Sequence, residues 1–165
     1  MKCDAAEQAN AGVLIIGIGN PLRGDDGAAV AVVMALQGEA DLAGVTCVLA
    51  QQLMPEHAAA ASEATCLLIV DASVEHAPGE VCCRAVRASE SGGTLFGHHL
   101  TPEQLLRLTE AAFGRVPAAM VVSVGAAEFA LGVGLSPAVA HGVTEAVHLA
   151  RAQLAAWLDD GVCHV

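Results

Sequence analysis

Three short runs of apolar residues constrain the fold of this chain more than any other feature. They are "VLIIGI" (13–18), "CLLIVDA" (66–72) and "AAMVVSVGA" (118–126), and each has the length of a strand. A strand that is apolar on both faces is typical of a parallel sheet covered by helices on both sides. We therefore expect these runs to form the buried centre of a mainly parallel sheet.

Helical segments stand between these runs. Further strands are expected at 45–50 and, near the sheet edge, at 79–87, whereas helices are expected from Asp25 through the apolar run 28–36, within 54–64, over 101–112 and from the N-cap Ser136 onwards. Alternating strands and helices predict an α/β fold: a single three-layer domain, residues 1–165, with a mainly parallel twisted sheet flanked by helices. Residues 1–11 are expected to be flexible.

Composition excludes several functional classes. Of the 165 residues 55% are hydrophobic and 15% charged, which is typical of a chain that folds rather than of a disordered one. A net charge of −11 repels nucleic acids and anionic membranes. No apolar stretch approaches the roughly 20 residues that span a bilayer, so we expect a soluble cytoplasmic protein. The six cysteines form no CxxC pair, and neither a zinc site nor a disulfide framework is indicated.

The stretch "GIGNPLRGDDG" (17–27) has the form of a phosphate-binding loop but carries the opposite charge. The dinucleotide pattern GxGxxG fails at its third glycine, where Leu22 stands. Gly19 and Gly24 have the spacing of a P-loop, but Asp25 and Asp26 replace its lysine and hydroxyl residue. Two carboxylates repel phosphate and favour a cation.

Two carboxylates are expected to meet at one edge of the sheet, because Asp26 follows the first strand and Asp71 ends the third. Together they suit a divalent metal, and an imidazole would be a fitting third ligand. The best-placed imidazole is His98 or His99 in "GHHL", a glycine-flanked loop before a helix. The alternative is that Asp25 caps the helix, Asp26 is solvated and Asp71 forms a turn.

Other hydrolytic mechanisms have little support in the sequence. No GxSxG, no HExxH and no Cys-His signature is present. Asp25 and Asp26 are neighbours and cannot face each other as an aspartic-protease dyad; Asp26 and Asp71 could in principle do so, but His98 favours metal instead.

The chain resembles the nickel-iron hydrogenase maturation proteases. The resemblance rests on "GIGNPLRGDDGAAV", "LLIVDA", "HHLTPEQLL" and "VGAAEFALGVGLSPAV", which occur in the family's order and cover nearly the whole chain. By position, the family's metal-contacting residues fall on Asp26, Asp71 and His98, with His99 as the alternative register. The resemblance implies an endopeptidase that trims the C-terminus of a nickel-loaded hydrogenase large-subunit precursor, after its last cysteine motif, at a His or Arg.

The resemblance further implies that the nickel is carried by the substrate, and that other divalent metals can substitute for it. On this hypothesis nickel positions the scissile segment, and a carboxylate such as Asp25 or Asp26 assists proton transfer. Two rival hypotheses stay open: a nickel-binding maturation chaperone that cuts nothing, and a small-ligand-binding domain whose acidic loop is structural. A protease that docks on one large partner is expected to be a monomer, with no nucleic acid or membrane as partner.

Overall fold

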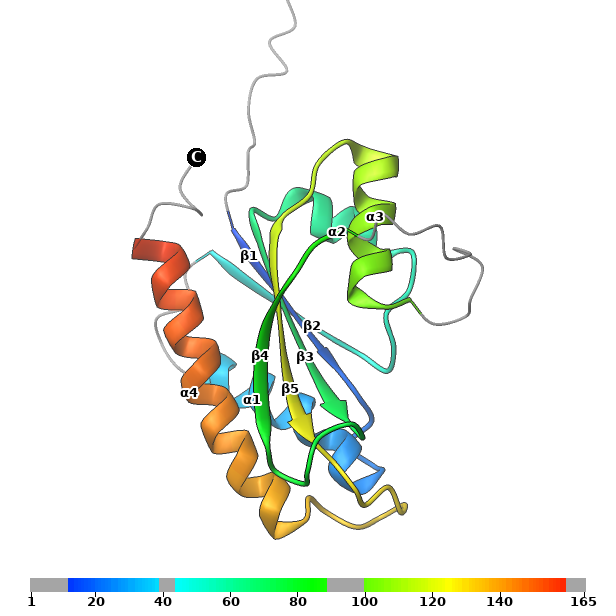
Figure 1. Cartoon of the computed structure of the whole chain (residues 1–165), viewed down its shortest axis with the longest axis vertical. Coiled ribbons are helices and arrows are strands. Elements are labelled where there is room, and N and C mark those ends of the chain that lie inside the picture. The colour runs from blue at the N-terminus through cyan, green and yellow to red at the C-terminus, as the bar shows by residue number, and fades with distance from the viewer. Residues whose placement is uncertain (1–11, 39–43, 89–99, 160–165) are drawn as a thin grey trace, which may run out of the picture.

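The structure is a computed structural model and describes residues 12–38, 44–88 and 100–159. These residues form one five-stranded sheet with helices on both faces, the α/β architecture expected from the sequence (Figure 1). In chain order the elements are β1 (Val13–Ile18), the 3-10 turn η1 (Gly24–Gly27), α1 (Ala28–Gln37), β2 (Val45–Ala50), α2 (His57–Glu63), β3 (Cys66–Ser73), β4 (Val81–Val86), α3 (Pro102–Phe113), β5 (Ala118–Gly125) and α4 (Pro137–Asp159).

The sheet is mainly parallel, as predicted. Its strand order is β2-β1-β3-β5-β4, and β1 pairs in parallel with both β2 and β3, which in turn pairs in parallel with β5. β4 is the exception, because it pairs with β5 in the antiparallel direction and forms the edge that its sequence indicates. The carboxyl ends of β1, β3 and β5 therefore meet at one end of the molecule.

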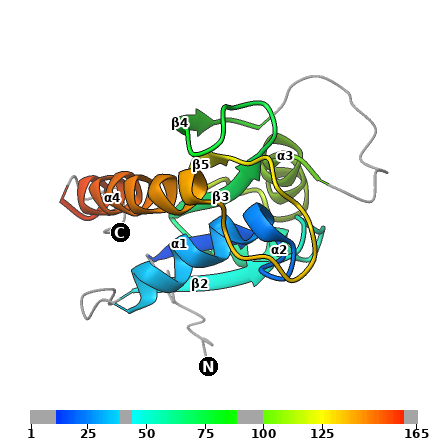
Figure 2. The same ribbon diagram turned by 90° about the horizontal axis from the view of Figure 1, so that it is seen from below.

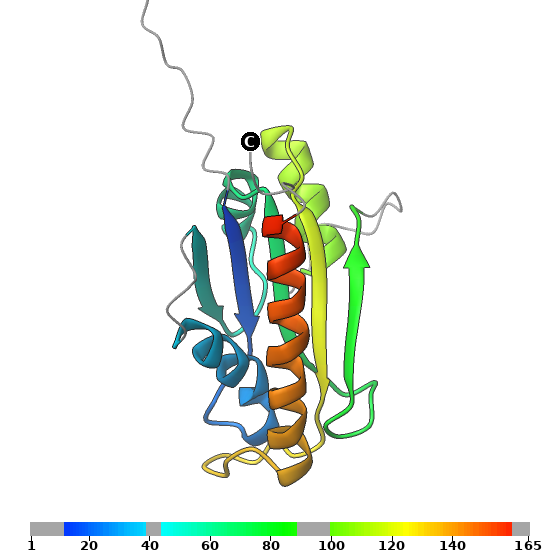
Figure 3. The ribbon, with the colours of Figure 1, turned by 90° about the vertical axis from the view of Figure 1, so that its left-hand side faces the viewer.

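Two helix layers enclose the sheet (Figure 2). Alternate residues of β1 divide between two cores: Val13 and Ile15 pack towards α1 and α4, whereas Leu14 and Ile16 pack towards α2 and α3. The strand is buried along its whole length, which explains why its sequence is apolar at every position. α4 runs along the length of the sheet (Figure 3). No described helix is both long and apolar enough to cross a bilayer.

The helix expected to begin at Asp25 starts differently. Residues 24–27 form a 3-10 turn, and the α-helix begins only at Ala28. Residue 27 of this turn is closely packed, because a Cβ on Gly27 would lie 2.9 Å from the Cα of Pro21. 3-10 turns of this kind are common at helix starts, but periodicity alone does not distinguish them from the α-helix that follows.

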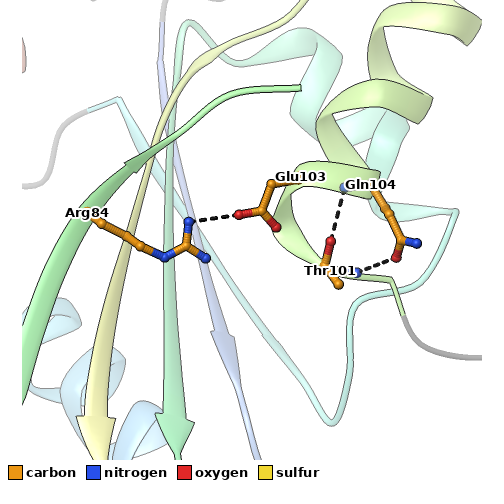
Figure 4. A network of polar contacts seen from close by, with 4 residues as sticks. All are labelled: Arg84, Thr101, Glu103 and Gln104. Atoms are coloured by element: carbon orange, nitrogen blue, oxygen red, sulfur yellow. Dashed lines mark hydrogen bonds and ion pairs between the residues drawn. The ribbon is translucent and has the colours of Figure 1, made fainter. Parts of the chain in front are cut away.

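The start of α3 is fixed by side-chain bonds (Figure 4). The Thr101 hydroxyl accepts a hydrogen bond from the Gln104 N–H, and the Gln104 side chain accepts one from the Thr101 N–H, which is a complete capping box. Arg84 of β4 donates to Glu103 at 2.7 Å. The strand and the helix on either side of residues 89–99 are thus joined to each other.

Candidate functional site

The candidate site lies where β1, β3 and β5 end. In Figure 1 this is the lower end of the molecule, where the chain enters α1 and α4. Three connections border it: residues 19–27 after β1, residues 74–80 after β3, and residues 126–136 after β5. This position agrees with the rule that sites in open parallel sheets lie beyond the carboxyl ends of the strands.

Asp26 is delivered to this edge by a tight turn after β1. Gly19 has a φ of +149°, and a Cβ there would lie 1.9 Å from the backbone carbonyl oxygen of Asp26, so only glycine fits. The turn closes when the Asn20 N–H donates to Oδ2 of Asp26 at 2.9 Å. The carboxylate is half-buried and held in place by the backbone of the same turn.

Asp71 lies in β3 next to this turn. In the sheet register it pairs with Ile18 of β1 and with Ser123 of β5. Strand alternation places it on the same face as Leu67 and Ile69, the face covered by α2 and α3. It is the first residue of β3 that is not fully buried, so a charged group stands where the apolar core ends.

Asp26 and Asp71 are close enough to interact electrostatically. Burial raises the pKa of Asp71 to about 6, a backbone hydrogen bond from Ala72 opposes the rise, and the negative charge of Asp26 adds to it. A divalent cation between the two carboxylates would relieve this repulsion, and oxygen donors of this kind suit such an ion. The pair predicted from the sequence is therefore brought together in the structure.

Asp25 has an entirely different environment from Asp26. It is fully buried, and its carboxylate accepts backbone N–H bonds from Ala127 at 3.1 Å, Glu128 at 2.9 Å and Ser136 at 2.7 Å. Burial raises its pKa, but these backbone bonds outweigh burial and lower the pKa below its usual range. Asp25 makes no side-chain capping bond in η1 or α1, so it does not cap its own helix as considered above.

Sequence reasoning did not find these partners of Asp25. They lie 102 to 111 residues further along the chain, and backbone donors leave no mark in the sequence. The available signal was weak: a second acidic residue directly before the candidate ligand.

The predicted imidazoles His98 and His99 lie outside the described residues. Leu100, the next residue in the chain, is buried in the same core as Leu67 and Ile69, on the face of the sheet that carries Asp71. Within the described ranges no three His, Cys, Asp or Glu side chains gather closely enough to hold a metal. His98 as the third ligand therefore stays a prediction.

Exposed apolar residues lie in the connections after β1 and β5. Gly132 N–H donates to the Leu22 carbonyl at 3.0 Å, which joins the connection after β5 to the turn after β1. Leu22 and Leu131 are 68% and 76% exposed. Next to them lies a shallow groove of about 230 Å³, lined among others by Pro21, Met34 and Leu135. The sequence analysis did not anticipate this surface.

Comparison with known proteins identifies solved structures with a similar architecture. No family model and no curated protein sequence matches the chain, but solved structures do. The hydrogenase maturating endopeptidase HybD from E. coli has a TM-score of 0.67 and 24% identity, over 91% of this chain and 94% of that one. The hydrogenase 2 maturation peptidase from Thaumarchaeota archaeon SCGC_AB-539-E09 has a TM-score of 0.64 and 20% identity, over 87% and 98%.

A third structure has the higher identity of 27%. It is the [NiFe] hydrogenase maturation protease HybD from Thermococcus kodakarensis, with a TM-score of 0.61 over 86% of this chain and 98% of that one. The chain has the hydrogenase maturation protease fold. The resemblance inferred from four short motifs is thereby confirmed in three dimensions, and it spans nearly the full length of each hydrogenase maturation protease compared.

Proposed function

We propose that this chain is an endopeptidase that removes the C-terminal extension of a nickel-loaded nickel-iron hydrogenase large subunit. The observation that carries the proposal is the meeting of Asp26 and Asp71 at the carboxyl edge of the sheet, with repulsion between them. The HybD structures from E. coli and Thermococcus kodakarensis that this fold matches are named as a hydrogenase maturating endopeptidase and a hydrogenase maturation protease, which supports the reaction class.

In this proposal the nickel belongs to the substrate. Asp26, Asp71 and His98 form an open set of two carboxylates and one imidazole for a metal held partly by another protein. Other divalent metals would be able to substitute for nickel, because the carboxylate oxygens discriminate little between such ions. Recognition of the metal would place the segment to be cut against the turn after β1, so that only a loaded precursor is positioned for cleavage.

Proton transfer is assigned to Asp26 rather than Asp25. Asp26 is half-buried and uses Oδ2 for the Asn20 N–H, whereas Asp25 is fully buried and both of its oxygens accept backbone bonds. A group that exchanges protons with a reacting peptide has to come within hydrogen-bond reach of it. Of the two neighbours, Asp26 meets that requirement better.

The apolar surface around the site favours a protein partner over a small ligand. Leu22, Leu131 and Val133 are exposed in the connections after β1 and β5, and exposed apolar groups of this kind are more typical of a protein interface than of a site for a small polar ligand. Together with the shallowness of the neighbouring groove, this favours docking of a large partner. We propose that the protein acts on it as a monomer in the cytoplasm.

The test is incubation of the purified protein with the large-subunit precursor in nickel-loaded and nickel-free forms, followed by intact mass measurement of the precursor. We expect loss of the C-terminal extension in the loaded form only. Cleavage of neither form, with nickel retained or delivered, would favour a maturation chaperone. Equal cleavage of both forms would overturn nickel recognition while leaving the protease assignment in place.

A further inference from the structure

The buried carboxylate of Asp25 has no part in the proposed chemistry, yet it is the most strongly hydrogen-bonded side chain at the site. It is 0% exposed and receives three backbone N–H groups from residues 127–136. A fully buried charge is costly unless such donors surround it. The chain therefore keeps an ion in its interior whose bonds all reach to the connection after β5.

The backbone reinforces this link. The Asp25 N–H donates to the Glu128 carbonyl at 2.7 Å, so the two residues bond in both directions. Gly24 has a φ of +54°, and a Cβ there would lie 2.5 Å from the same carbonyl oxygen. The turn after β1 and the connection after β5 are thus in direct contact, with no room for a side chain between them.

Asp26 depends on this contact because it is the next residue. Its N–H donates to the Arg23 carbonyl at 3.1 Å, and its Oδ2 accepts from Asn20, so both bonds stay within the turn. The turn bonds to β2 at Gly19 and to the connection after β5 at Leu22 and Asp25, and Asp25 is the one of these residues that is adjacent to Asp26. A shift of Asp25 would consequently be passed to Asp26 through one peptide bond.

We infer that Asp25 is a positioning residue: its carboxylate holds the connection after β5 against the turn after β1 and thereby sets the orientation of the Asp26 carboxylate. Only the use made of Asp26 rests on the proposed function. The link between the two segments is a property of the fold and can be measured without a substrate.

Amide hydrogen exchange measured by NMR tests the link at single residues. The Asn20 amide reports on Asp26, because it donates to that carboxylate, and the amides of Ala127, Glu128 and Ser136 report on Asp25. In Asp25→Asn we expect all four amides to exchange at least about tenfold faster, with the central strand amides of Ile16 and Leu68 unchanged. Unchanged exchange at Asn20 would overturn the inference.

Thr109→Ala is the matched control for a loss of stability elsewhere. Thr109 is also fully buried and hydrogen-bonded, but it lies in α3, where its hydroxyl donates to the Leu105 carbonyl at 2.8 Å. We expect this variant to leave the Asn20 amide unaffected. If it accelerates Asn20 as much as Asp25→Asn does, the effect is general loosening and the inference is wrong.

A measurement on the unaltered protein decides the matter if Asp25→Asn does not fold. If Asp25 holds the two segments together, they should open as one unit. The amides of Asn20, Ala127, Glu128 and Ser136 should then be protected from exchange to a similar degree, and their protection should decrease in the same way with added denaturant. Independent opening of Asn20 would contradict the inference.

A consequence for activity follows if Asp25→Asn folds. Processing of the nickel-loaded precursor by this variant is expected to fall about 10- to 100-fold. If the unaltered protein processes nothing, the proposed function fails, and the exchange data still decide the role of Asp25.

Discussion

The pKa values of Asp25 and Asp71 are shifted in opposite directions, although both are carboxylates near the same edge of the sheet. Burial alone raises the pKa of each. Asp25 receives three backbone N–H bonds that favour its charged form. Asp71 receives one such bond, and the negative charge of Asp26 disfavours the charged form of Asp71. The number of donors decides which carboxylate is a stable internal ion and which is destabilised.

Asp71→Asn is therefore expected to stabilise the protein near neutral pH. The pKa of Asp71 rises from 3.8 to about 6 on folding, so between these values the folded chain binds more protons than the unfolded chain. Its stability then falls as pH rises through this window. Removing the carboxylate should raise the free energy of unfolding by roughly 2–3 kcal/mol at pH 7 and by little at pH 4.

Urea unfolding of both proteins at pH 4, 5, 6 and 7, without divalent metal, measures this difference. Glu75→Gln is the matched control, because it also removes one negative charge but from an exposed side chain after β3. A gain of stability in Glu75→Gln equal to that in Asp71→Asn, or a gain independent of pH, would show that burial of Asp71 is not the cause.

The two neighbouring histidines are expected to differ in importance. If His98 is the metal-contacting histidine, as the resemblance implies, His98→Ala should lower processing of a nickel-loaded precursor by at least about 100-fold. His99→Ala should retain most of the rate. The measurement is the initial rate of extension loss by mass spectrometry, and the reverse order of the two variants would shift the register by one residue.

At this scale the acidic pair could be predicted from the sequence, and the role of Asp25 could not. Asp26 and Asp71 each follow an apolar strand, and parallel strands end at a common edge, so their proximity follows from topology. Asp25 depends on backbone groups more than 100 residues away. Only the folded chain shows which of two adjacent carboxylates turns inwards.

At the scale of elements, the fully apolar strands were the most predictable part. β1 and β3 have the bounds or nearly the bounds expected, since both faces are buried and every position has to be apolar. The start of α3 was indicated by Thr-Pro-Glu and is confirmed as a capped helix end. The 3-10 turn before α1 was missed, because hydrophobic periodicity does not distinguish a short 3-10 turn from the first turn of the α-helix that follows.

Gly19→Ala is expected to be far more damaging than a substitution at another glycine of positive φ. A Cβ at Gly19 meets the Asp26 carbonyl oxygen at 1.9 Å, whereas one at Gly114, with φ +66°, meets nothing within 4 Å. We expect a loss of about 3 kcal/mol or more for Gly19→Ala and about 1 kcal/mol for Gly114→Ala. Thermal unfolding of both variants measures this, and equal losses would contradict the packing described for the turn.

At the scale of the whole molecule, three exposed apolar residues, Leu22, Leu131 and Val133, lie in the connections that follow β1 and β5. Leu131→Asp is expected to slow processing of the precursor roughly tenfold by weakening docking, with the free energy of unfolding changed by less than about 0.5 kcal/mol. The matched control is Phe113→Asp, a substitution of an exposed apolar residue at the C-terminal end of α3.

The rate as a function of precursor concentration separates docking from chemistry. We expect Leu131→Asp to raise KM with little change in kcat, and Phe113→Asp to change neither. An unchanged KM in Leu131→Asp would remove this surface from the docking site.

The central claim is that Asp26 and Asp71 act together on a nickel-loaded precursor, and the most direct measurement is the mass of that precursor after incubation with Asp71→Asn. We predict a precursor of full length, although the variant is folded and at least as stable as the unaltered protein. Removal of the extension at the unaltered rate, by Asp71→Asn and by Asp26→Asn alike, would contradict the assignment of this edge of the sheet as the active site.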